Sequence, residues 1–328
     1  MKKKIGIIFG GPSNEREVSI SSAINVGKNI DSDIFDPILV YWDKKGHFSI
    51  VDSLDLIEDG NRIHVEDLKN LFEIAFLVTH GKYGEDGVLQ AILENQQIRY
   101  TGCHVLSSAL CMDKIMFKDL MTGLSIIAQA KYFGFDFDLN SLGEIEDIQK
   151  QAIKELKFPL FVKPANSGSS VGITKVNNPD GLKDAILEAH KHDSRIIIEE
   201  GFVNQKEVEV AILGNQELVV SDPGQLIVPG GFYDYDEKYK LDKTKIVIPA
   251  DLTEEETREC KALASKVYKI CGCGGFARVD LFVLGGKVFI NEINTLPGFT
   301  NISMYPKLMA TAGIGYKELI TKIIELIY

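Results

Sequence analysis

Apolar runs and glycine turns alternate through the first hundred residues of the chain. The first apolar run is followed by a turn, Gly10 to Ser13, and then by a helical pattern, so the chain opens as strand, glycine turn and helix. The pattern predicts strands at 4–9, 38–42 and 74–79 and helices at 15–30, 87–95 and 105–120. Because strands that alternate with helices form parallel sheets, we expect a small open α/β domain here.

Strand patterns outnumber helical ones in the rest of the chain. The pattern predicts a hairpin in the middle of the chain, with a short strand before Pro164, a loop of glycine and serine at 166–172 and a second strand at 173–176. A phosphate loop that caps a helix is not expected here, because a strand follows the loop. Further strands are expected at 196–199, 207–213, 218–221, 245–248, 279–283 and 288–291, with helices at 253–271 and near the C-terminus. Such a succession of strands favours antiparallel sheets, so we expect the whole chain to combine a parallel sheet with antiparallel ones.

Charge and composition exclude several classes of protein. The 36 Lys and Arg against 47 Asp and Glu give a net charge of −11, which opposes a broad nucleic-acid surface but allows a small anionic ligand. No apolar run approaches the roughly 18 residues of a membrane span, and the apolar start ends too early for an export signal. Five cysteines without scaffold spacing, Cys271 and Cys273 among them, indicate reduced thiols that serve packing. We therefore expect a cytoplasmic protein.

Carboxylates near the end of the chain form the strongest candidate for a metal site. Asp280 follows Arg278 by two positions on one expected strand, and Glu292 and Asn294 stand two apart on the next. Residues two apart on a strand point to the same face, so these oxygens can reach one cation together. Oxygen ligands of this kind suit Mg²⁺ held jointly with nucleotide phosphates. The alternative is a solvated polar face, although apolar neighbours flank each carboxylate.

Three lysines are candidates for neutralising phosphates. Lys163 ends an apolar strand, where an ammonium group is costly unless an anion meets it. Lys114 follows Met112 and Asp113 and could equally be an exposed helix residue, and Lys238 stands in the polar segment 235–239. Small residues after Asn166 leave backbone amides free to cradle a phosphoryl group. The sequence lacks a P-loop motif and the third glycine of the dinucleotide fingerprint, so both common nucleotide folds are disfavoured.

Two turns complete the candidate site. His80 opens a glycine-rich segment that follows an apolar strand, and ligands bind at such strand ends in open α/β sheets. A lone histidine is more often structural, so His80 by itself does not establish a ligand site here. The turn from Asn294 to Thr300 offers backbone amides that could stabilise an oxyanion together with Arg278.

Seven segments in order, GGPSNEREVS, HGKYGEDG, MDK, FVKPANSGSSVGI, FYDYDEKY, FARVD and INEINTLPGFTNISMYP, resemble the signature segments of the D-alanine:D-alanine ligases of the ATP-grasp superfamily. The resemblance implies a mixed α/β and α+β fold, in which a Rossmann-like open α/β domain precedes two mixed or antiparallel sheets that clasp a nucleotide. The implied domains are the N-terminal domain at 1–98, a central subdomain at 99–198 and a C-terminal subdomain at 199–328. The implied activity is ATP-dependent formation of D-alanyl-D-alanine through a D-alanyl phosphate, for peptidoglycan precursors.

The resemblance also implies roles toward ATP and metal. Two Mg²⁺ ions, for which Mn²⁺ could substitute, would be held by Asp280, Glu292 and Asn294. The residues implied at the nucleotide are Lys114, Lys163, Lys238 and Ser169 near the phosphates, Glu207 at the ribose, and Glu199, Glu200 and Val203 at the adenine-side hinge.

The roles implied toward the amino-acid substrates fall on both halves of the chain. The first substrate would meet Glu15, which Ser169 and Tyr239 link by hydrogen bonds, with His80 beside it. Arg278 and the Gly298 amide would stabilise the tetrahedral intermediate. The remaining implied contacts are Ser303 and the Met304 amide at the second substrate's carboxylate and Tyr233 in a lid at 229–245.

Three alternatives remain beside this interpretation. A compact end of the lid is similar to that of the D-alanine:D-serine branch, so D-serine is a second candidate for the second substrate. A dehydrogenase rests only on the first glycine turn, and a nucleotide sensor without chemistry predicts broken phosphate or metal positions, which are intact here. The resemblance further suggests a homodimer through the first domain, with D-alanine and ATP as small-molecule partners and with neither nucleic acid nor membrane.

Overall fold

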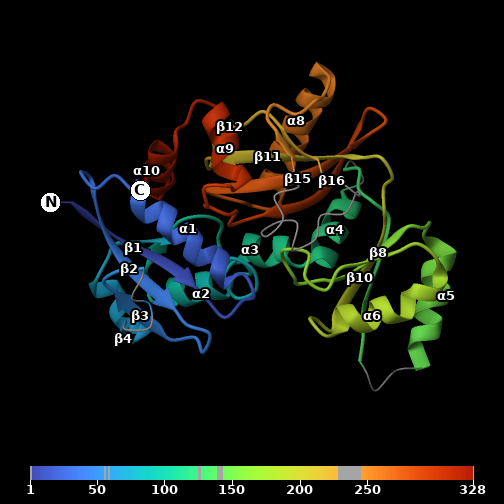
Figure 1. The fold of residues 1–328 in the computed structure, drawn as a ribbon, viewed down its shortest axis with the longest axis horizontal. Helices are drawn as coiled ribbons and strands as arrows, with labels where there is room; N and C mark the ends of the chain where they lie inside the picture. The colour runs from blue at the N-terminus through green and yellow to red at the C-terminus, as the bar shows by residue number, and fades with distance from the viewer. Residues whose placement is uncertain are drawn as a thin grey trace.

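A computed structural model describes residues 2–54, 57, 60–124, 127–138, 143–227 and 245–327. Three sheets follow one another along the chain, and Figure 1 shows them as a blue part, a green to yellow part and a part that runs from the yellow β11 to red. The expected Tyr233, Lys238 and Tyr239, with nearly all of the expected lid, lie outside the described residues. In the described part, none of the helices combines the length and apolar character needed to cross a membrane.

The first sheet is the predicted open α/β unit, with strand order β4-β3-β2-β1-β5-β6. Its four parallel strands are β1 (Lys3–Gly10), β2 (Phe35–Trp42), β5 (Ile74–Leu77) and β6 (Arg99–Tyr100). An antiparallel edge that the pattern did not predict comprises β3 (Phe48–Val51) and β4 (Asn61–Ile63). The helices are α1 (Arg16–Asn29), α2 (Val88–Asn95) and the 3-10 helix η2 (Val65–Asn70).

The glycine turn after β1 brings α1 to the carboxyl end of the sheet. Gly10 has a φ of +93°, and a Cβ there would stand 2.5 Å from the Trp42 carbonyl oxygen. Only glycine fits this close approach without displacing β2. The turn therefore fixes where the residues just before α1, Glu15 among them, enter the site.

The single helix expected at 105–120 is wrong, because the structure has two helices there. α3 (Val105–Met112) ends at Asp113, whose backbone is extended (φ −80°, ψ 103°), and α4 (Lys114–Gly123) begins directly after it. The Asp113 carboxylate accepts hydrogen bonds from the amides of Ile115 and Met116, each at 3.0 Å. This N-cap starts the second helix and makes Lys114 its first residue.

Removing this cap should destabilise the protein. Asp113→Ala leaves two helix-terminal amides without their acceptor and is expected to lower the free energy of unfolding by about 1–2 kcal/mol. Asp113→Asn keeps an acceptor oxygen and should lose less than about half of that. Urea unfolding of the two variants beside the wild type measures the difference, and equal losses would mean that the carboxylate has no capping role.

The central sheet is antiparallel throughout, with strand order β7-β10-β8-β9. The hairpin predicted around the glycine and serine loop is confirmed as the pair β8 and β9. Its strands are β7 (Tyr132–Asp136), β8 (Leu160–Pro164), β9 (Thr174–Val176) and β10 (Arg195–Glu200), and its helices are α5 (Ile145–Glu155), the 3-10 helix η4 (Pro179–Gly181) and α6 (Leu182–His190).

The third sheet is antiparallel along β14-β13-β11-β15-β16, and β12 pairs with β11. Its strands are β11 (Lys206–Leu213), β12 (Val219–Val220), β13 (Gly224–Ile227), β14 (Lys245–Val247), β15 (Phe276–Leu284) and β16 (Lys287–Asn294). The helices that follow along the chain are α8 (Glu254–Ile270), α9 (Met304–Thr311) and α10 (Tyr316–Glu325). A capping box of Thr253 and Glu256 fixes the start of α8.

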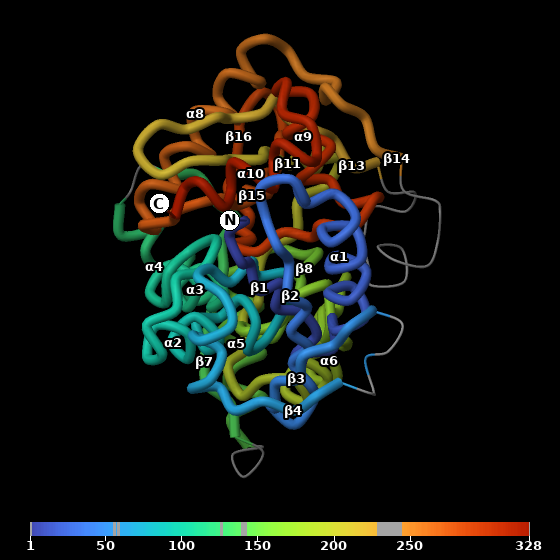
Figure 2. Tube along the Cα trace, turned by 90° about the vertical axis from the view of Figure 1, so that its left-hand side faces the viewer, coloured from blue at the N-terminus to red at the C-terminus, as the bar shows by residue number. Residues whose placement is uncertain are grey.

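The end of the chain returns to its beginning. α10 contacts α1, and Figures 1 and 2 both show the C-terminal helix beside the N-terminal strands. Leu319 and Ile323 of α10 share one apolar core with Ile5 and Ile7 of β1. The first and third sheets are thus joined by a common core, and residues far apart in the sequence meet at their junction.

Candidate functional site

One cavity of about 640 Å³ lies where the three sheets meet. Of the predicted site residues that the structure describes, Val203 alone does not line it and is 60% exposed. Those that line the cavity are Glu15, His80, Lys114, Lys163, Ser169, Glu199, Glu200, Glu207, Arg278, Asp280, Glu292, Asn294, Gly298, Ser303 and Met304.

One wall of the cavity, from α4 and the central sheet, carries a surplus of positive charge. Lys163 on β8 donates to Glu199 Oε2 at 2.8 Å, and the fully buried Lys118 lies 3.7 Å from Glu199 Oε1. Although burial opposes it, the two ammonium groups lower the pKa of Glu199. Lys114 adds a third ammonium group, which donates to the Ser167 carbonyl at 2.7 Å. Three cations therefore face one buried carboxylate, and this wall favours an anion.

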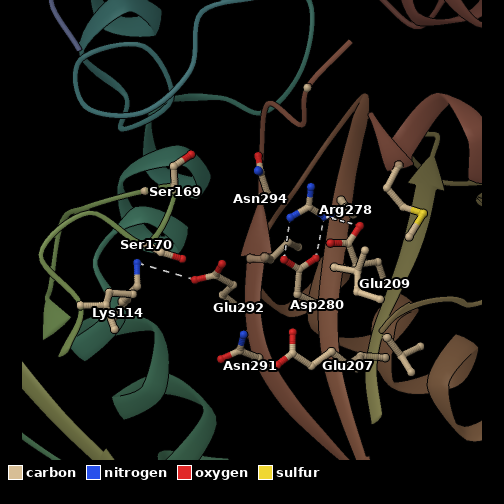
Figure 3. A pocket seen from close by; sticks show the side chains of 18 of the residues that line it. Lys114, Ser169, Ser170, Glu207, Glu209, Arg278, Asp280, Asn291, Glu292 and Asn294 are labelled. Carbon is tan, nitrogen blue, oxygen red and sulfur yellow. Dashed lines mark hydrogen bonds and ion pairs between the residues drawn. The ribbon is translucent and has the colours of Figure 1, made fainter. Parts of the chain in front are cut away.

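The opposite wall, from the third sheet, carries a surplus of negative charge. Glu207 and Glu209 stand on β11, Asp280 on β15 and Glu292 on β16, with Arg278 as the one cation among them. Figure 3 shows these side chains opposite Lys114 and the serines, and Lys114 reaches Glu292 Oε2 at 3.6 Å. The cavity is thus basic on one side and acidic on the other.

Arg278 organises the acidic wall. Its Nε and one terminal nitrogen each donate to Asp280 at 2.7 Å, and Nε also lies 3.2 Å from Glu209 Oε2. Burial alone would lower the pKa of Arg278, but the charges of Asp280 and Glu209 raise it well above its usual value. The guanidinium therefore stays charged and compensates the carboxylates around it.

The predicted metal ligands lie together at this wall. Asp280 is directly paired with Glu292 across β15 and β16, and Arg278 with Asn294, next to a register shift after Asp280. Among the residues that the structure describes, no three His, Cys, Asp or Glu side chains form a complete cage for an ion. Two carboxylates and an amide oxygen instead suit Mg²⁺ that takes its other ligands from phosphates and water. The residues present fit a divalent cation bound with a phosphorylated ligand.

Glu15 lies at the carboxyl end of the first sheet, where two glycines leave space for its carboxylate. A Cβ at Gly81 would stand 2.3 Å from Glu15 Oε2, and one at Gly168 would stand 2.7 Å from it. The Ser169 hydroxyl donates to Glu15 Oε1, which joins the serine loop of the central sheet to the first domain. The contact expected between these two residues is present, and substitution of either glycine would displace the carboxylate.

His80 is held on both sides of its ring by protein groups. Its Nδ1 lies 2.9 Å from the Leu296 carbonyl, so that nitrogen carries the proton, and its Nε2 accepts from the Ser22 hydroxyl at 3.0 Å. Ser22 in turn accepts from the Phe299 amide at 3.2 Å. Burial lowers the pKa of His80 to about 4, and the charge of Arg278 adds to this effect. The neutral ring thus ties α1 to the turn after β16.

Acid should therefore weaken the fold through His80. The unfolded chain binds the proton near pH 6.5 and the folded protein only near pH 4, so this contribution is full above pH 6.5 and is lost as pH falls to about 4. The loss is expected to be roughly 3 kcal/mol. Urea unfolding at pH 7.5, 6, 5 and 4.5 should show a shallower pH dependence for His80→Gln than for the wild type, with the exposed His64→Gln as control. Parallel profiles for wild type and His80→Gln would contradict the assignment.

The turn after β16 supplies backbone groups to the cavity. A Cβ at Gly298 would stand 2.7 Å from Ser303 Oγ, which itself accepts from the Thr300 amide at 3.0 Å. Ser303 precedes α9, so the amide of Met304 lies in the first turn of that helix, where anions are favoured. These groups can bind a carboxylate or an oxyanion.

Some cavity residues were missed by the sequence interpretation. Glu209 stands two positions after Glu207 on one strand face, so strand alternation could have found it. Glu85 is buried in the glycine-rich segment that begins at His80, and burial together with Glu15 raises its pKa well above the usual value. Phe202 stands inside the segment 199–203 that the resemblance implies as the adenine-side hinge, and it lines the cavity and packs against Phe289.

Two family models match the chain. The model described as "D-ala D-ala ligase N-terminus" matches residues 4–103, and the one described as "D-ala D-ala ligase C-terminus" matches residues 122–325. A D-alanine–D-alanine ligase of Clostridium acetobutylicum is 42% identical over 99% of this chain and 98% of its own. One from Acetivibrio thermocellus is 40% identical over 99% of this chain and 96% of its own.

Solved structures resemble the whole fold. The VanG D-Ala:D-Ser ligase from Enterococcus faecalis has a TM-score of 0.89 and 37% identity, and the match covers all of both chains. The D-alanine-D-alanine ligase from Coxiella burnetii has a TM-score of 0.84 and 29% identity, with 99% of this chain and 93% of that chain covered.

Proposed function

The chain belongs to the D-alanine–D-alanine ligase family, and from this membership we propose that it joins two D-alanine molecules at the expense of ATP. The reaction passes through a D-alanyl phosphate and supplies a precursor of peptidoglycan. The observation that carries the proposal is the cavity with one basic and one acidic wall. A polyphosphate with its divalent cations matches that distribution of charge, which a neutral ligand would not need.

The basic wall is the proposed phosphate site. Lys114 and Lys163 neutralise the phosphates of ATP with Lys238, and the Ser169 loop supports them with backbone amides. Toward the adenosine, Glu207 accepts from the ribose hydroxyls, and the hinge of Glu199, Glu200 and Val203 lies beside the adenine. Glu199 is buried and contacts both Lys118 and Lys163, which supports a second role in which its carboxylate holds these two ammonium groups in position.

The acidic wall is the proposed metal site. Asp280, Glu292 and Asn294 would hold two Mg²⁺ ions, for which Mn²⁺ is the proposed substitute, and the ions would neutralise phosphate charge. Arg278 keeps Asp280 in place by its two hydrogen bonds. Exclusion of water from the acyl phosphate is the proposed role of the lid at 229–245.

The two amino acids bind between Glu15 and the start of α9 in this proposal. Glu15, oriented by Ser169 and Tyr239, accepts from the ammonium group of the first D-alanine, with His80 beside it. Tyr233 and the lid cover the site. The amine of the second D-alanine attacks the acyl phosphate, and Arg278 and the Gly298 amide stabilise the oxyanion that forms. Ser303 and the Met304 amide bind the second carboxylate.

The purified protein with ATP and Mg²⁺ is expected to release phosphate only after D-alanine is added, and mass spectrometry should identify D-alanyl-D-alanine. L-alanine is the matched control, because it has the same atoms with the opposite hand. Phosphate release that does not depend on an amino acid would contradict the ligase assignment and favour a different nucleotide enzyme.

D-serine remains a second candidate for the second substrate. The likeness to the VanG D-Ala:D-Ser ligase favours it, whereas the curated relatives named above are D-alanine–D-alanine ligases. Offering D-alanine alone and then with D-serine or D-lactate separates the possibilities by product ratio. A mixed dipeptide that exceeds D-alanyl-D-alanine would move the chain to the D-serine branch.

The proposal extends to the state of the protein in the cell. We expect a cytoplasmic homodimer that associates through the first domain. Light scattering on the purified chain should give twice the mass of one chain, and a mass equal to one chain would contradict the dimer.

A further inference from the structure

Four of the five cysteines lie together in the apolar core that α8 and β15 share, and one of them, Cys111, also lines the cavity. Cys103 and Cys111 come from the segment that contains α3, and Cys271 and Cys273 from the loop between α8 and β15. All five cysteines are free thiols and buried, with Cys260 on α8 as the fifth. The cluster thus joins two segments that are some 160 residues apart in the sequence.

The loop Cys271–Gly275 is docked on one side of α3. The Ser107 hydroxyl donates to the Gly272 carbonyl at 2.6 Å, and the Cys103 thiol contacts the Gly274 carbonyl at 3.5 Å. One helical turn after Ser107, Cys111 Sγ lies 3.9 Å from Cys273 Sγ. The same face of the helix therefore brings one thiol directly opposite another.

The loop is built to let these sulfurs approach. A disulfide needs them at about 2.0 Å, so they must move closer by roughly 2 Å. Gly272 and Gly275 have φ values of +65° and +72°, and a Cβ at Gly272 would meet only Ser107 Oγ, at 3.7 Å. The open space beside Gly272, the neighbour of Cys273, allows that displacement, whereas Gly275 stays packed against the backbone of Gly102, whose nitrogen would stand 3.0 Å from a Cβ there.

Two further observations separate this cluster from inert packing. Cys111 lines the cavity, so a small molecule in the cavity meets it directly. Cys273, whose sulfur lies 3.9 Å from that of Cys111, is the most exposed residue of the four at 9%. Metal storage is disfavoured, because within the described ranges no group of three or more candidate side chains could hold an ion.

We propose that Cys111 and Cys273 form a reversible disulfide when a hydroperoxide reaches them. The Cys273 thiolate attacks one peroxide oxygen, which gives a sulfenic acid on Cys273 and releases an alcohol, or water in the case of hydrogen peroxide. The Cys111 sulfur then attacks Cys273 Sγ, the S–O bond breaks, and water leaves with the thiol proton. The two thiols lose two electrons in total, and the peroxide gains them. A dithiol reductant restores the two thiols by reducing the disulfide.

The assignment of the attacking sulfur rests on the contacts around it. The thiols of Cys103 and Cys111 both lie within hydrogen-bonding reach of Cys273 and lower its pKa. The pKa of Cys103 is raised chiefly by Cys273, and that of Cys111 by Cys271 and then by Cys273. Only the thiolate reacts with peroxide at a useful rate. Cys273 is therefore the first sulfur to react and Cys111 the one that resolves it.

The bond would also change the site. Cys111 stands three residues before Lys114, and Cys273 five residues before Arg278, so the link displaces two segments that carry the proposed machinery. A displacement of about 1 Å at such groups can lower turnover by roughly 100-fold. This second consequence rests on the proposed function, whereas formation of the bond does not.

The test uses the full chain, treated with hydrogen peroxide, unfolded in N-ethylmaleimide and digested with trypsin without reduction. Cleavage yields peptides 100–114 and 270–278, each with two cysteines, so fragmentation must assign the sulfurs. We expect one linked species that joins Cys111 to Cys273 and disappears with dithiothreitol. Unlinked peptides, or a link through Cys103 or Cys271, would overturn the proposal. The measurement is made on the wild-type protein, so it does not depend on whether any variant folds.

Matched serine variants extend the test. Cys111→Ser and Cys273→Ser should abolish the link, and Cys260→Ser should form it like the wild type. In the ligase assay, peroxide should lower the turnover of wild type and Cys260→Ser about ten-fold or more, with recovery in dithiothreitol. Full turnover in a completely linked protein would refute the effect on the site while leaving the ligase assignment intact.

Discussion

Arg278→Met should destabilise the protein by about 3–5 kcal/mol and lower the turnover of the ligase reaction by about 100-fold or more. The variant leaves the carboxylates of Asp280 and Glu209 in a buried wall without the cation that contacts both. Methionine is similar in length and apolar, so little of the loss comes from a cavity. The free energy of unfolding in urea and the turnover with D-alanine measure the two effects.

The pH dependence of this loss identifies its cause. Without Arg278 the folded carboxylates should have raised pKa values, so the variant binds protons on folding and recovers stability as pH falls from 8 to 5.5. Arg258→Met is the control, because Arg258 forms an exposed ion pair with Glu255 on α8 and should cost no more than about 1 kcal/mol. A loss at Arg278 as small as that at Arg258 would show that the wall does not depend on its guanidinium.

Glu292→Gln should lower turnover by about 100- to 1000-fold while leaving the fold intact. The substitution preserves shape and removes one charge from the proposed metal site. Glu292 is 36% exposed and its contact with Lys114 is long at 3.6 Å, so the pair contributes little to stability. Relief of repulsion from Asp280, its direct neighbour across the strands, offsets part of that small loss.

Activity and stability should thus separate at this position. The turnover is measured across a Mg²⁺ titration, where the variant should need more metal, and melting temperature reports the fold. Glu217→Gln makes the same chemical change at an exposed position and should match the wild type in both measurements. Near-normal turnover of Glu292→Gln with an unchanged Mg²⁺ requirement would refute its role in metal binding.

The two substitutions together distinguish architecture from chemistry at the acidic wall. Arg278 is expected to affect both stability and turnover, because it contacts Asp280 and Glu209 and is only 18% exposed. Glu292 is expected to affect turnover alone, because it is 36% exposed and lines the cavity. Asp280 and Glu292 are neighbours and share that cation, so their effects should not add.

Local patterns in the sequence determined much of this protein. Alternating apolar runs specified the parallel strands β1, β2 and β5, and the hairpin β8–β9 followed from two strand patterns around a glycine and serine loop. The positions of Arg278, Asp280, Glu292 and Asn294 on paired strands also followed from residue spacing, because side chains on a strand alternate strictly. The seven segments then indicated the family, which the comparisons established.

Short or capped elements escaped the same patterns. The helix expected at 105–120 is broken because Asp113 accepts bonds from the next helix's first amides, a choice that a periodic apolar face does not reveal. The strands β3, β4 and β6 are too short for an alternation to stand out.

Only the tertiary structure decided how distant residues act on one another. It placed Lys118 and Lys163 against the buried Glu199, gave His80 two partners from α1 and the turn after β16, and set Cys111 opposite Cys273. The physical reason is that charge compensation, pKa and thiol contact depend on distance and burial, whereas a sequence specifies only spacing along the chain.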